Sequence, residues 1–224
     1  MDYSTLRMCS LFAGIPEEDI RDDLDAVPHR IQRYGKGEAV FRLMDPANRA
    51  GIVLSGRVQA QKPFPNGSQV NVSARSAGET IGPAAAFSKS GRYPCDVVAL
   101  EPSAVLMLRK ADLLTLMQRD ARIMGNLMSE LATATYMLQQ RLELLSYGGI
   151  AQKAAFYLLM QVRQSRQNLV AIPGTVSNWA MLMNVSRPSL HRELRRLEAA
   201  GAIAYHPPTI EIRDATAPRD MLGR

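Results

Sequence analysis

Cysteine and histidine are scarce in this sequence. Of its 224 residues, two are cysteines, Cys9 and Cys95, and three are histidines. That count excludes a four-thiolate iron–sulfur or zinc site within one chain. The two thiols lie far apart and form no CxxC pair, which is typical of a reducing cytoplasm rather than of a disulfide-stabilised secreted domain. We therefore expect no iron–sulfur cluster.

Long apolar runs and catalytic motifs are also missing. No run of about 18 apolar residues predicts a membrane span, and the N-terminal residues lack the charged start and long apolar core of a signal peptide. The histidines His29, His191 and His206 are scattered, and no Ser-His-Asp set, paired carboxylates, phosphate loop or metal-spaced cluster accompanies them. The sequence predicts a soluble cytoplasmic protein that has no membrane association and is not an enzyme.

The positive charge is unevenly spread along the chain. The net charge is +6 and the pI is about 9.6, which favours an acidic partner such as nucleic acid. Residues 147–213 carry eight Lys or Arg against three Asp or Glu, whereas residues 1–146 carry seventeen against sixteen. The excess therefore lies in the C-terminal part of the chain, as a DNA-binding domain there would require.

Residues 175–197, TVSNWAMLMNVSRPSLHRELRRL, predict two short helices joined by a tight turn. Asn184 tolerates a left-handed backbone in the turn, Ser186 can cap the second helix, and Pro188 fits its first turn. Apolar residues recur on one side of each helix, as in amphipathic helices. These sides are predicted to consist of Trp179, Met181, Leu182 and Met183 in the first helix and of Leu190, Leu194 and Leu197 in the second.

The other side of the second helix presents Ser, His and Arg side chains. A short, apolar-backed helix of this composition is the form that enters a DNA major groove. Taken alone, the pattern also fits a surface helix with a solvated basic face. The polar residues concerned are Arg187, Ser189, His191, Arg192, Arg195 and Arg196.

The N-terminal part of the chain changes from a helical start to short strands. Residues 4–27 are predicted to be helical, with Pro16 in a first turn followed by carboxylates. Short alternating segments separated by turn residues follow, and Asn66-Gly67 is a strong hairpin signal. This spacing predicts a closed or double-sheet β structure. The predicted strands are IQRY, AVFRL, AGIVLSGRVQAQ, SQVNVSAR, CDVVAL and AVLMLR.

After a short helix at 111–120, residues 121–145 predict one long helix. Its apolar stripe is close to a heptad and wider than one small sheet requires, which favours a dimer seam that also packs on its own domain; an ordinary core helix is the alternative. Gly148 and Gly149 then predict a hinge. A helix at 151–164, the helix pair and a hairpin around Pro207-Pro208 complete a winged-helix pattern. The stripe comprises Met124, Leu127, Leu131, Ala134, Leu138 and Leu145, broadened by Met128, Met137 and Leu142.

In this order, the parts resemble the CRP/FNR family of bacterial transcription regulators over nearly the whole chain. The most specific segments are VLSGRVQ at 53–59, AGETIGPAAAF at 77–87 and NVSRPSLHRELRRLEAAGAI at 184–203. The resemblance implies an α+β fold with an N-terminal β-roll like a cyclic-nucleotide-binding jelly roll, a long dimerisation helix and a C-terminal winged helix-turn-helix. We predict residues 1–110 as the β-roll effector domain, 111–146 as the dimerisation helix, 147–213 as the DNA-binding domain and 214–224 as a flexible tail.

The resemblance also implies the partners. These are a second copy of the chain, a palindromic site on double-stranded DNA, and RNA polymerase. Arg187 and Arg192 match two arginines of the family's recognition helix, and such a fork can bind guanine O6 and N7. Pro188 replaces the base-reading Glu between them, so we expect an operator that differs from the family's usual half-sites. The predicted DNA-binding residues are Thr175, Asn178, Ser186, Arg187, Ser189, His191, Arg192 and Arg195, with Thr175 and Asn178 suited to phosphates.

The effector pocket departs from the nucleotide-binding members of the family. Pro83 stands where they place the Glu for the ribose, and Tyr93-Pro94 replaces the Arg-Ser pair for the cyclic phosphate. The pair that would read the adenine falls at Leu138-Gln139. Without these polar groups, cyclic AMP is not the expected effector unless Arg92 turns into the pocket. The predicted pocket comprises Gly82, Pro83, Ala84, Arg92, Tyr93, Pro94, Cys95, Leu138 and Gln139.

Other effectors stay open at this point. A haem-dependent gas or redox sensor, as in another branch of the family, would need a ligand such as His29 or Cys95, because Ser88 occupies the position of the carbon-monoxide sensors' His. A pocket with apolar walls could instead hold a hydrophobic or aromatic small molecule, or be empty in a constitutive activator. The alternative from a different class is a cyclic-nucleotide-type module whose helix pair binds protein.

Overall fold

The computed structural model describes residues 3–64, 69–214, 216 and 222. The chain divides into two compact units, Met1–Ala134 and Thr135–Arg224. The division falls inside the long helix α5, Ala121–Ser146, and not at a junction between elements. Within the described residues, no helix is both long and apolar enough to cross a membrane.

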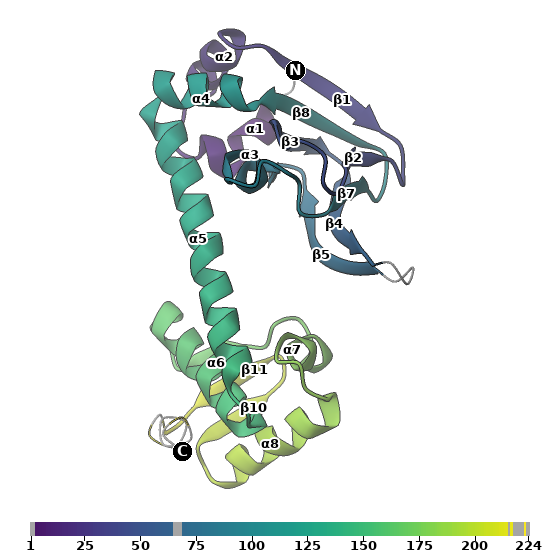
Figure 1. Cartoon of the computed structure of the whole chain (residues 1–224). Helices are drawn as coiled ribbons and strands as arrows, with labels where there is room; N and C mark the ends of the chain where they lie inside the picture. The colour runs from purple at the N-terminus through teal and green to yellow at the C-terminus, as the bar shows by residue number, and fades with distance from the viewer. Residues whose placement is uncertain (1–2, 65–68, 215, 217–221, 223–224) are drawn as a thin grey trace. The chain divides into compact units, whose positions relative to one another are not determined.

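The first unit contains two four-stranded antiparallel sheets (Figure 1), which confirms the predicted double-sheet β structure. One sheet has the strand order β1-β8-β3-β6 and the other β2-β7-β4-β5. The strands are β1 (His29–Tyr34), β2 (Ala39–Phe41), β3 (Arg49–Ser55), β4 (Arg57–Pro63), β5 (Gln69–Ser76), β6 (Thr80–Ile81), β7 (Asp96–Ala99) and β8 (Ser103–Arg109). The Asn66-Gly67 turn lies outside the described residues, and β4 and β5 on either side of it pair in antiparallel register.

Strands β3 and β8 are apolar on both faces because each face serves a different core. Ile52 of β3 and Leu106 of β8 pack in a cluster with the helices of this unit. Val53 and Val105, one residue away on each strand, pack in a second cluster that draws on both sheets. Successive strand residues point to opposite faces, so this near-continuous apolar sequence fills two cores at once.

The N-terminal helical segment of the first unit is more broken than the sequence predicts. Residues 4–27 do not form continuous helix, because Gly14 has a φ of 74° and breaks the segment after η1. Pro16 is the extended N-cap of the last helix in this segment and does not lie in its first turn. The helices are α1 (Ser4–Arg7), the 3-10 turn η1 (Ser10–Phe12), α2 (Glu17–Asp25), α3 (Pro83–Phe87), α4 (Lys110–Arg119) and the start of α5. Neither β6 nor α3 was predicted from the sequence.

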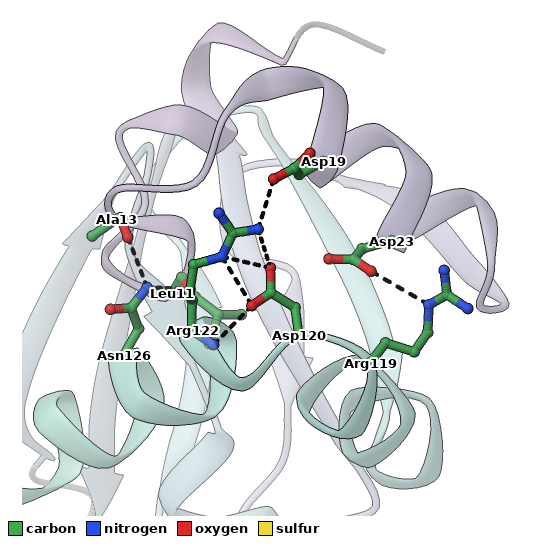
Figure 2. Close-up of polar contacts among 8 residues, drawn as sticks. All are labelled: Leu11, Ala13, Asp19, Asp23, Arg119, Asp120, Arg122 and Asn126. Carbon is green, nitrogen blue, oxygen red and sulfur yellow. Dashed lines mark hydrogen bonds and ion pairs between the residues drawn. The ribbon is translucent and has the colours of Figure 1, made fainter.

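Polar contacts anchor the first turns of α5 to the N-terminal segment (Figure 2). The guanidinium of Arg122 lies 2.6 Å from both Asp19 of α2 and Asp120. Its hydrogen bonds hold the pKa of Asp120 below the usual range. One turn further on, the Asn126 amide donates to the carbonyl of Leu11 at 3.1 Å. This end of α5 is therefore part of the first unit's framework.

Helix α5 divides its apolar residues between two roles. Ile123 and Leu127 are buried in the core of the first unit. Met124 and Met128, one position further along the chain, are 48% and 61% exposed. The predicted broad stripe is therefore two stripes, and the exposed one continues with Leu138, Leu142 and Leu145.

The second unit combines helices with a small antiparallel sheet of order β10-β11-β9. Its core surrounds Trp179, which is fully buried with Leu190 and Leu194. The predicted hairpin is present, and a third strand, β9, was not predicted. The elements after α5 are α6 (Ile150–Ser165), β9 (Leu169–Ala171), α7 (Val176–Leu182), α8 (Arg187–Ala199), β10 (Ile203–His206) and β11 (Thr209–Ile212).

Candidate functional site

The start of α8 is built as the sequence predicts. Asn184 has a φ of 52°, the left-handed backbone that ends the turn after α7. The Ser186 hydroxyl accepts a hydrogen bond from the Ser189 N–H at 3.2 Å, which caps the helix. Pro188 lies in the first turn, where no intrahelical N–H bond is needed. These local preferences fix where α8 begins and so which side chains its first turns present.

The outer face of α8 carries a connected set of polar groups. The Ser189 Oγ accepts from the Ser186 hydroxyl at 2.8 Å and from Arg192 Nη2 at 3.3 Å. Because Ser189 accepts both bonds, its own hydroxyl hydrogen can be donated to a ligand. Arg187, His191 and Arg192 are exposed, and Leu190 on the opposite side is fully buried. The predicted residues of this helix therefore do share one accessible face.

The basic residues further along α8 are engaged within the protein. Arg195 lies 2.6 Å from Glu198 and packs over the Tyr205 ring at 5.5 Å. The Arg195 contact and the hydrogen bond from the Tyr205 N–H lower the pKa of Glu198. Arg196 pairs with Glu193 at 3.2 Å. These pairs leave Arg187 and Arg192 as the arginines of α8 best placed to bind an acidic partner.

Helix α7 supports α8 and presents its own N-terminus. The Thr175 hydroxyl accepts from the Asn178 N–H at 3.1 Å, and both residues are exposed. At the other end, the buried Lys153 ammonium donates to the Met183 carbonyl at 3.1 Å. A cation at a helix C-terminus is electrostatically favourable. Met181, predicted on the apolar side, is instead 69% exposed, because the buried stripe of α7 runs through Trp179, Ala180 and Met183.

The predicted hinge lies between α5 and α6. Both Gly148 and Gly149 are exposed. Gly149 has an extended backbone and is the N-cap of α6, where its N–H donates to the Gln152 side chain at 3.3 Å. Neither glycine has a positive φ. The segment is thus a short, capped connection between two helices.

A cavity of about 240 Å³ lies in the first unit. It is lined by residues of β2, β4, β5, β6, α3 and β7 and by α5. From the predicted pocket, Gly82, Pro83, Ala84, Tyr93, Pro94 and Cys95 line it. Arg92, Leu138 and Gln139 do not. Burial raises the pKa of the Cys95 thiol, so the protonated form is favoured.

Close packing fixes the backbone at the start of α3. Gly82 has a φ of 80°, and a Cβ there would lie 2.9 Å from the Phe41 ring. Pro83 follows as the first residue of the helix and offers no N–H to a ligand. A glycine is required at position 82 for both reasons.

Tyr93, which the sequence count places at the position of the family's phosphate-binding pair, belongs to an aromatic pair. Phe41 and Tyr93 stack with ring centroids 4.2 Å apart. The Tyr93 hydroxyl donates to the Arg49 carbonyl at 2.8 Å, and burial raises the pKa of this phenol. Arg92 donates to the Met44 carbonyl at 2.8 Å and does not line the cavity. The arrangement therefore lacks the register shift that would turn Arg92 inward.

The α5 wall of the cavity is formed by Glu130, Leu131 and Ala134. The predicted pair Leu138-Gln139 belongs to the second unit and begins one helical turn after Ala134. The ungapped alignment therefore predicts the correct helix, but it places the pocket residues one helical turn beyond those that line the cavity.

Four polar residues that the sequence did not single out also line the cavity: Ser73, Arg75, Thr80 and Glu130. The Glu130 carboxylate accepts hydrogen bonds from the Thr80 hydroxyl and, at 2.7 Å, from the Ser10 hydroxyl. Arg75 lies directly across from the buried Val58 in the register of β4 and β5. Since paired residues share a face of the sheet, this register places Arg75 on the same face as Val58, where it lines the cavity while its side chain stays 44% exposed. Without the pairing of β4 with β5, the sequence does not predict that Arg75 lies on this face.

The two candidate haem ligands lie in different places. Cys95 lines the cavity, whereas His29 lines a separate groove on β1 and β8. The Nδ1 of His29 is within hydrogen-bond distance of the Leu24 and Val27 carbonyls. In the described residues, no group of three or more His, Cys, Asp and Glu is arranged to hold a metal ion. A cavity of this volume is also below the size typical of sites for drug-sized ligands, so this donor set does not fit a haem.

Comparison with known families and structures agrees with this architecture. Residues 31–120 match the model of the cyclic nucleotide-binding domain. Residues 152–217 match the model of the Crp-like helix-turn-helix domain. Together the two models span most of the chain, and they fall on the unit with the cavity and the unit with the α7–α8 pair, respectively.

Individual relatives and solved structures are similar to this chain over most of their own length. The chain is 27% identical over 205 residues to a cyclic AMP receptor protein of Thermus thermophilus, covering 92% of this chain and 93% of that protein. The crystal structure of the Thermus thermophilus catabolite activator protein covers 96% of this chain and 98% of its own, at 26% identity and a TM-score of 0.56. The sensor domain of the regulator DNR from Pseudomonas aeruginosa has the fold of the first unit, with a TM-score of 0.53 at 21% identity over 66% of this chain and 95% of its own.

Proposed function

Because the chain belongs to the CRP/FNR family of DNA-binding transcription regulators, we propose that it binds a palindromic operator as a homodimer under the control of an effector other than cyclic AMP. The observation that supports DNA reading is the exposed face of α8. There Arg187 and Arg192 flank Ser189 on one accessible side, while the neighbouring Arg195 and Arg196 are paired internally. We expect this chain to act in the cytoplasm, where bacterial DNA lies, and to perform no catalysis.

The proposed reading uses α8 in the major groove. Arg187 and Arg192 are assigned to bases, and Ser186, Ser189 and His191 to bases or phosphates. Thr175 and Asn178, exposed at the start of α7, are assigned to phosphates. Pro188 cannot replace the base-reading Glu of the family, so the operator should differ at that base pair.

The proposed dimer forms along the exposed stripe of α5. Met124, Met128, Leu138 and Leu142 are 48–69% exposed in the single chain. Their spacing of 4, 10 and 4 residues fits a seam of alternating fours and threes that also passes through positions 131 and 135. A second copy would remove this apolar surface from water. The effector would then change how the two long helices pair, and the connection at Gly148 and Gly149 would pass the change to the DNA-binding units, whose recognition helices lie about 34 Å apart on operator DNA.

The case against cyclic AMP rests on three positions. Pro83 has no side-chain acceptor and no N–H, Tyr93 at the aligned phosphate-binding position stacks on Phe41, and Arg92 donates to the Met44 carbonyl and does not line the cavity. A cyclic phosphate would therefore lack the family's arginine at its usual sequence position, and the cation that does line the cavity, Arg75, comes from β5 instead. We do not propose the alternative of a haem-dependent gas or redox sensor, because only one of its two candidate ligands, Cys95, lies on the cavity wall and His29 lines a separate groove.

RNA polymerase is the proposed protein partner. A groove of about 290 Å³ on β1, β3 and β8 carries Arg30, Arg49 and Arg109. Arg109 is paired with Asp112, whereas Arg30 and Arg49 are exposed. A basic groove of this kind suits an acidic surface of the enzyme. A variant with Arg30→Ala and Arg49→Ala should keep operator affinity and lose regulation in a purified transcription reaction.

The DNA-reading proposal is tested with a duplex that the wild-type protein selects from a random library. In fluorescence anisotropy, Arg192→Ala should weaken specific binding by about 1–3 kcal/mol, a factor of roughly 5–150, because the substitution removes a bidentate bond to a base. Arg196→Ala is the matched control and should change affinity little, since Arg196 pairs with Glu193. Unchanged affinity in Arg192→Ala would reject the assignment.

The salt dependence of binding distinguishes DNA binding from the alternative in which the helix pair binds protein. Wild-type affinity should fall steeply as salt rises, because contacts to phosphates release counterions. A helix pair that binds protein would show no DNA affinity with such a slope.

A further inference from the structure

We infer that the cavity of the first unit takes a small aromatic monocarboxylate, with Arg75 as the anchor for its carboxylate. This inference rests on the proposed function, which requires an effector in the cavity but does not name its class. The cavity volume of about 240 Å³ lies below the roughly 300–1,000 Å³ typical of drug-sized ligands. The space therefore suits a molecule of about one ring and not a nucleotide.

The walls select an apolar body. The larger apolar and aromatic side chains that line the cavity are Phe41, Val58, Ile81, Tyr93, Val97 and Leu131. Burial against such walls is favourable for a hydrocarbon ring and unfavourable for a ligand that is polar on all sides. Inorganic phosphate and free sugars are disfavoured on this ground.

One cation lines the cavity within the part of the chain that the structure describes. Arg75 lies on the same sheet face as Val58 and lines the cavity, with its side chain partly open to solvent. Its two described contacts, 3.5 Å to Glu79 and 3.4 Å to the Ala74 carbonyl, both use Nη1. The guanidinium fork matches a carboxylate better than any neutral group.

Glu130 also lines the cavity and is less available than Arg75 to bind a charged ligand. Glu130 already accepts hydrogen bonds from Thr80 and Ser10. These bonds occupy acceptor positions of its carboxylate, whereas both described contacts of Arg75 use Nη1 alone. We therefore assign the ligand's charged end to Arg75, so an acid is favoured over an amine.

The test uses the full-length protein in isothermal titration calorimetry with benzoate and phenylacetate as probes, and with benzamide and phenylacetamide as their neutral counterparts. At least one acid should bind at least about tenfold more tightly than its amide, since a charge-assisted hydrogen bond is about twice as strong as a neutral one. Arg75→Gln should remove that preference. Arg57→Gln on the neighbouring strand β4 is the matched control, because Arg57 is exposed and lies outside the cavity wall, and it should keep the preference.

A second variant should act in the opposite direction. Glu79 competes with the ligand for Arg75, so Glu79→Gln should tighten binding of the preferred acid about two- to fivefold while its side-chain oxygen can still accept from the Ser76 N–H. Equal affinity for acids and amides, no binding of either acid at 5 mM (a ceiling on the order of a weak effector's Kd), or tighter binding of cyclic AMP or phosphate would overturn the inference. Operator binding by the wild-type protein is measured in parallel. Its loss would overturn the proposed function, whereas intact operator binding without acid binding overturns the ligand class alone.

Discussion

The DNA-reading face and the effector cavity are assembled from different numbers of chain segments. The face comes from one helix, α8, its cap at Ser186 and the turn before it. The cavity draws on strands of both sheets, on α3 and on α5, with lining residues spread from position 41 to position 134. The face therefore depends on short-range preferences of a few residues, whereas the cavity depends on register and packing between distant segments. This difference should appear in how each region responds to substitution.

The largest expected effect is on the core that holds α8 in place. Leu194 is fully buried beside Trp179, so Leu194→Ala should lower the stability of the second unit by about 3 kcal/mol through reduced burial and a residual cavity. Trp179 is the single tryptophan of the chain, so its fluorescence during urea unfolding reports this unit. DNA affinity should fall with it.

The matched control for Leu194→Ala is Leu106→Ala in the first unit, where Leu106 is also fully buried. It should shift the far-UV circular dichroism transition and leave the Trp179 transition in place. If Leu194→Ala shifts the Trp179 fluorescence transition and the whole circular dichroism transition together, the two units unfold as one. The proposed difference in stability between them is then wrong.

The DNA-reading face could be predicted from the sequence because its determinants are local. The left-handed Asn184, the cap at Ser186, Pro188 in the first turn and the buried stripe at Leu190 and Leu194 were all predicted and are confirmed. The error on this unit, Met181, arose because α7 is only two turns long, so that its buried stripe is set by what it packs against.

The cavity could be predicted only in part. The Gly82–Pro83 turn and Tyr93 follow from a motif and were found at its wall. Arg75 required the pairing of β4 with β5, which sequence alternation alone does not give. The α5 contribution was assigned one helical turn too late, at Leu138 in place of Ala134, because a count along the chain carries no knowledge of where the helix meets the sheets.

A second prediction concerns the close packing of the cavity wall. Gly82→Ala should destabilise the first unit by about 2 kcal/mol, since a left-handed backbone costs an L-residue roughly 1–2 kcal/mol and the new Cβ would lie 2.9 Å from the Phe41 ring. Gly37→Ala is the control, because Gly37 has a φ of 83° with nothing within 4 Å of its Cβ position. The difference between the two variants in thermal unfolding measures the close approach, and equal losses would show that packing at Gly82 contributes nothing.

A smaller effect is expected at the cap of the DNA-reading helix. Ser186→Ala removes the acceptor for the Ser189 N–H and should cost about 1 kcal/mol in the Trp179 unfolding transition. It also removes a hydrogen bond to the Ser189 hydroxyl, so operator affinity should fall more than stability alone requires. Ser177→Ala, at an exposed position on α7, serves as the control and should leave both quantities near the wild-type values. If Ser186→Ala and Ser177→Ala change stability and operator affinity equally, the cap at Ser186 contributes to neither quantity.

The smallest expected effect is a pH-dependent loss of stability in the first unit. Arg109 donates two hydrogen bonds to Asp112, at 2.7 and 2.9 Å, and these bonds lower the pKa of the Asp112 carboxyl. A lowered folded-state pKa stabilises the fold above the unfolded value of about 4, and the contribution is lost as pH falls through the folded-state pKa. Asp112→Asn should therefore destabilise the first unit by less than about 1 kcal/mol at pH 7, because Arg109 is solvent-exposed, and the difference from wild type should shrink towards pH 3. Urea unfolding followed by circular dichroism at both pH values measures it, with the exposed Asp22→Asn as control. A difference that stays constant with pH would mean that Asp112 contributes through packing, as the cavity residues do, and not through its charge.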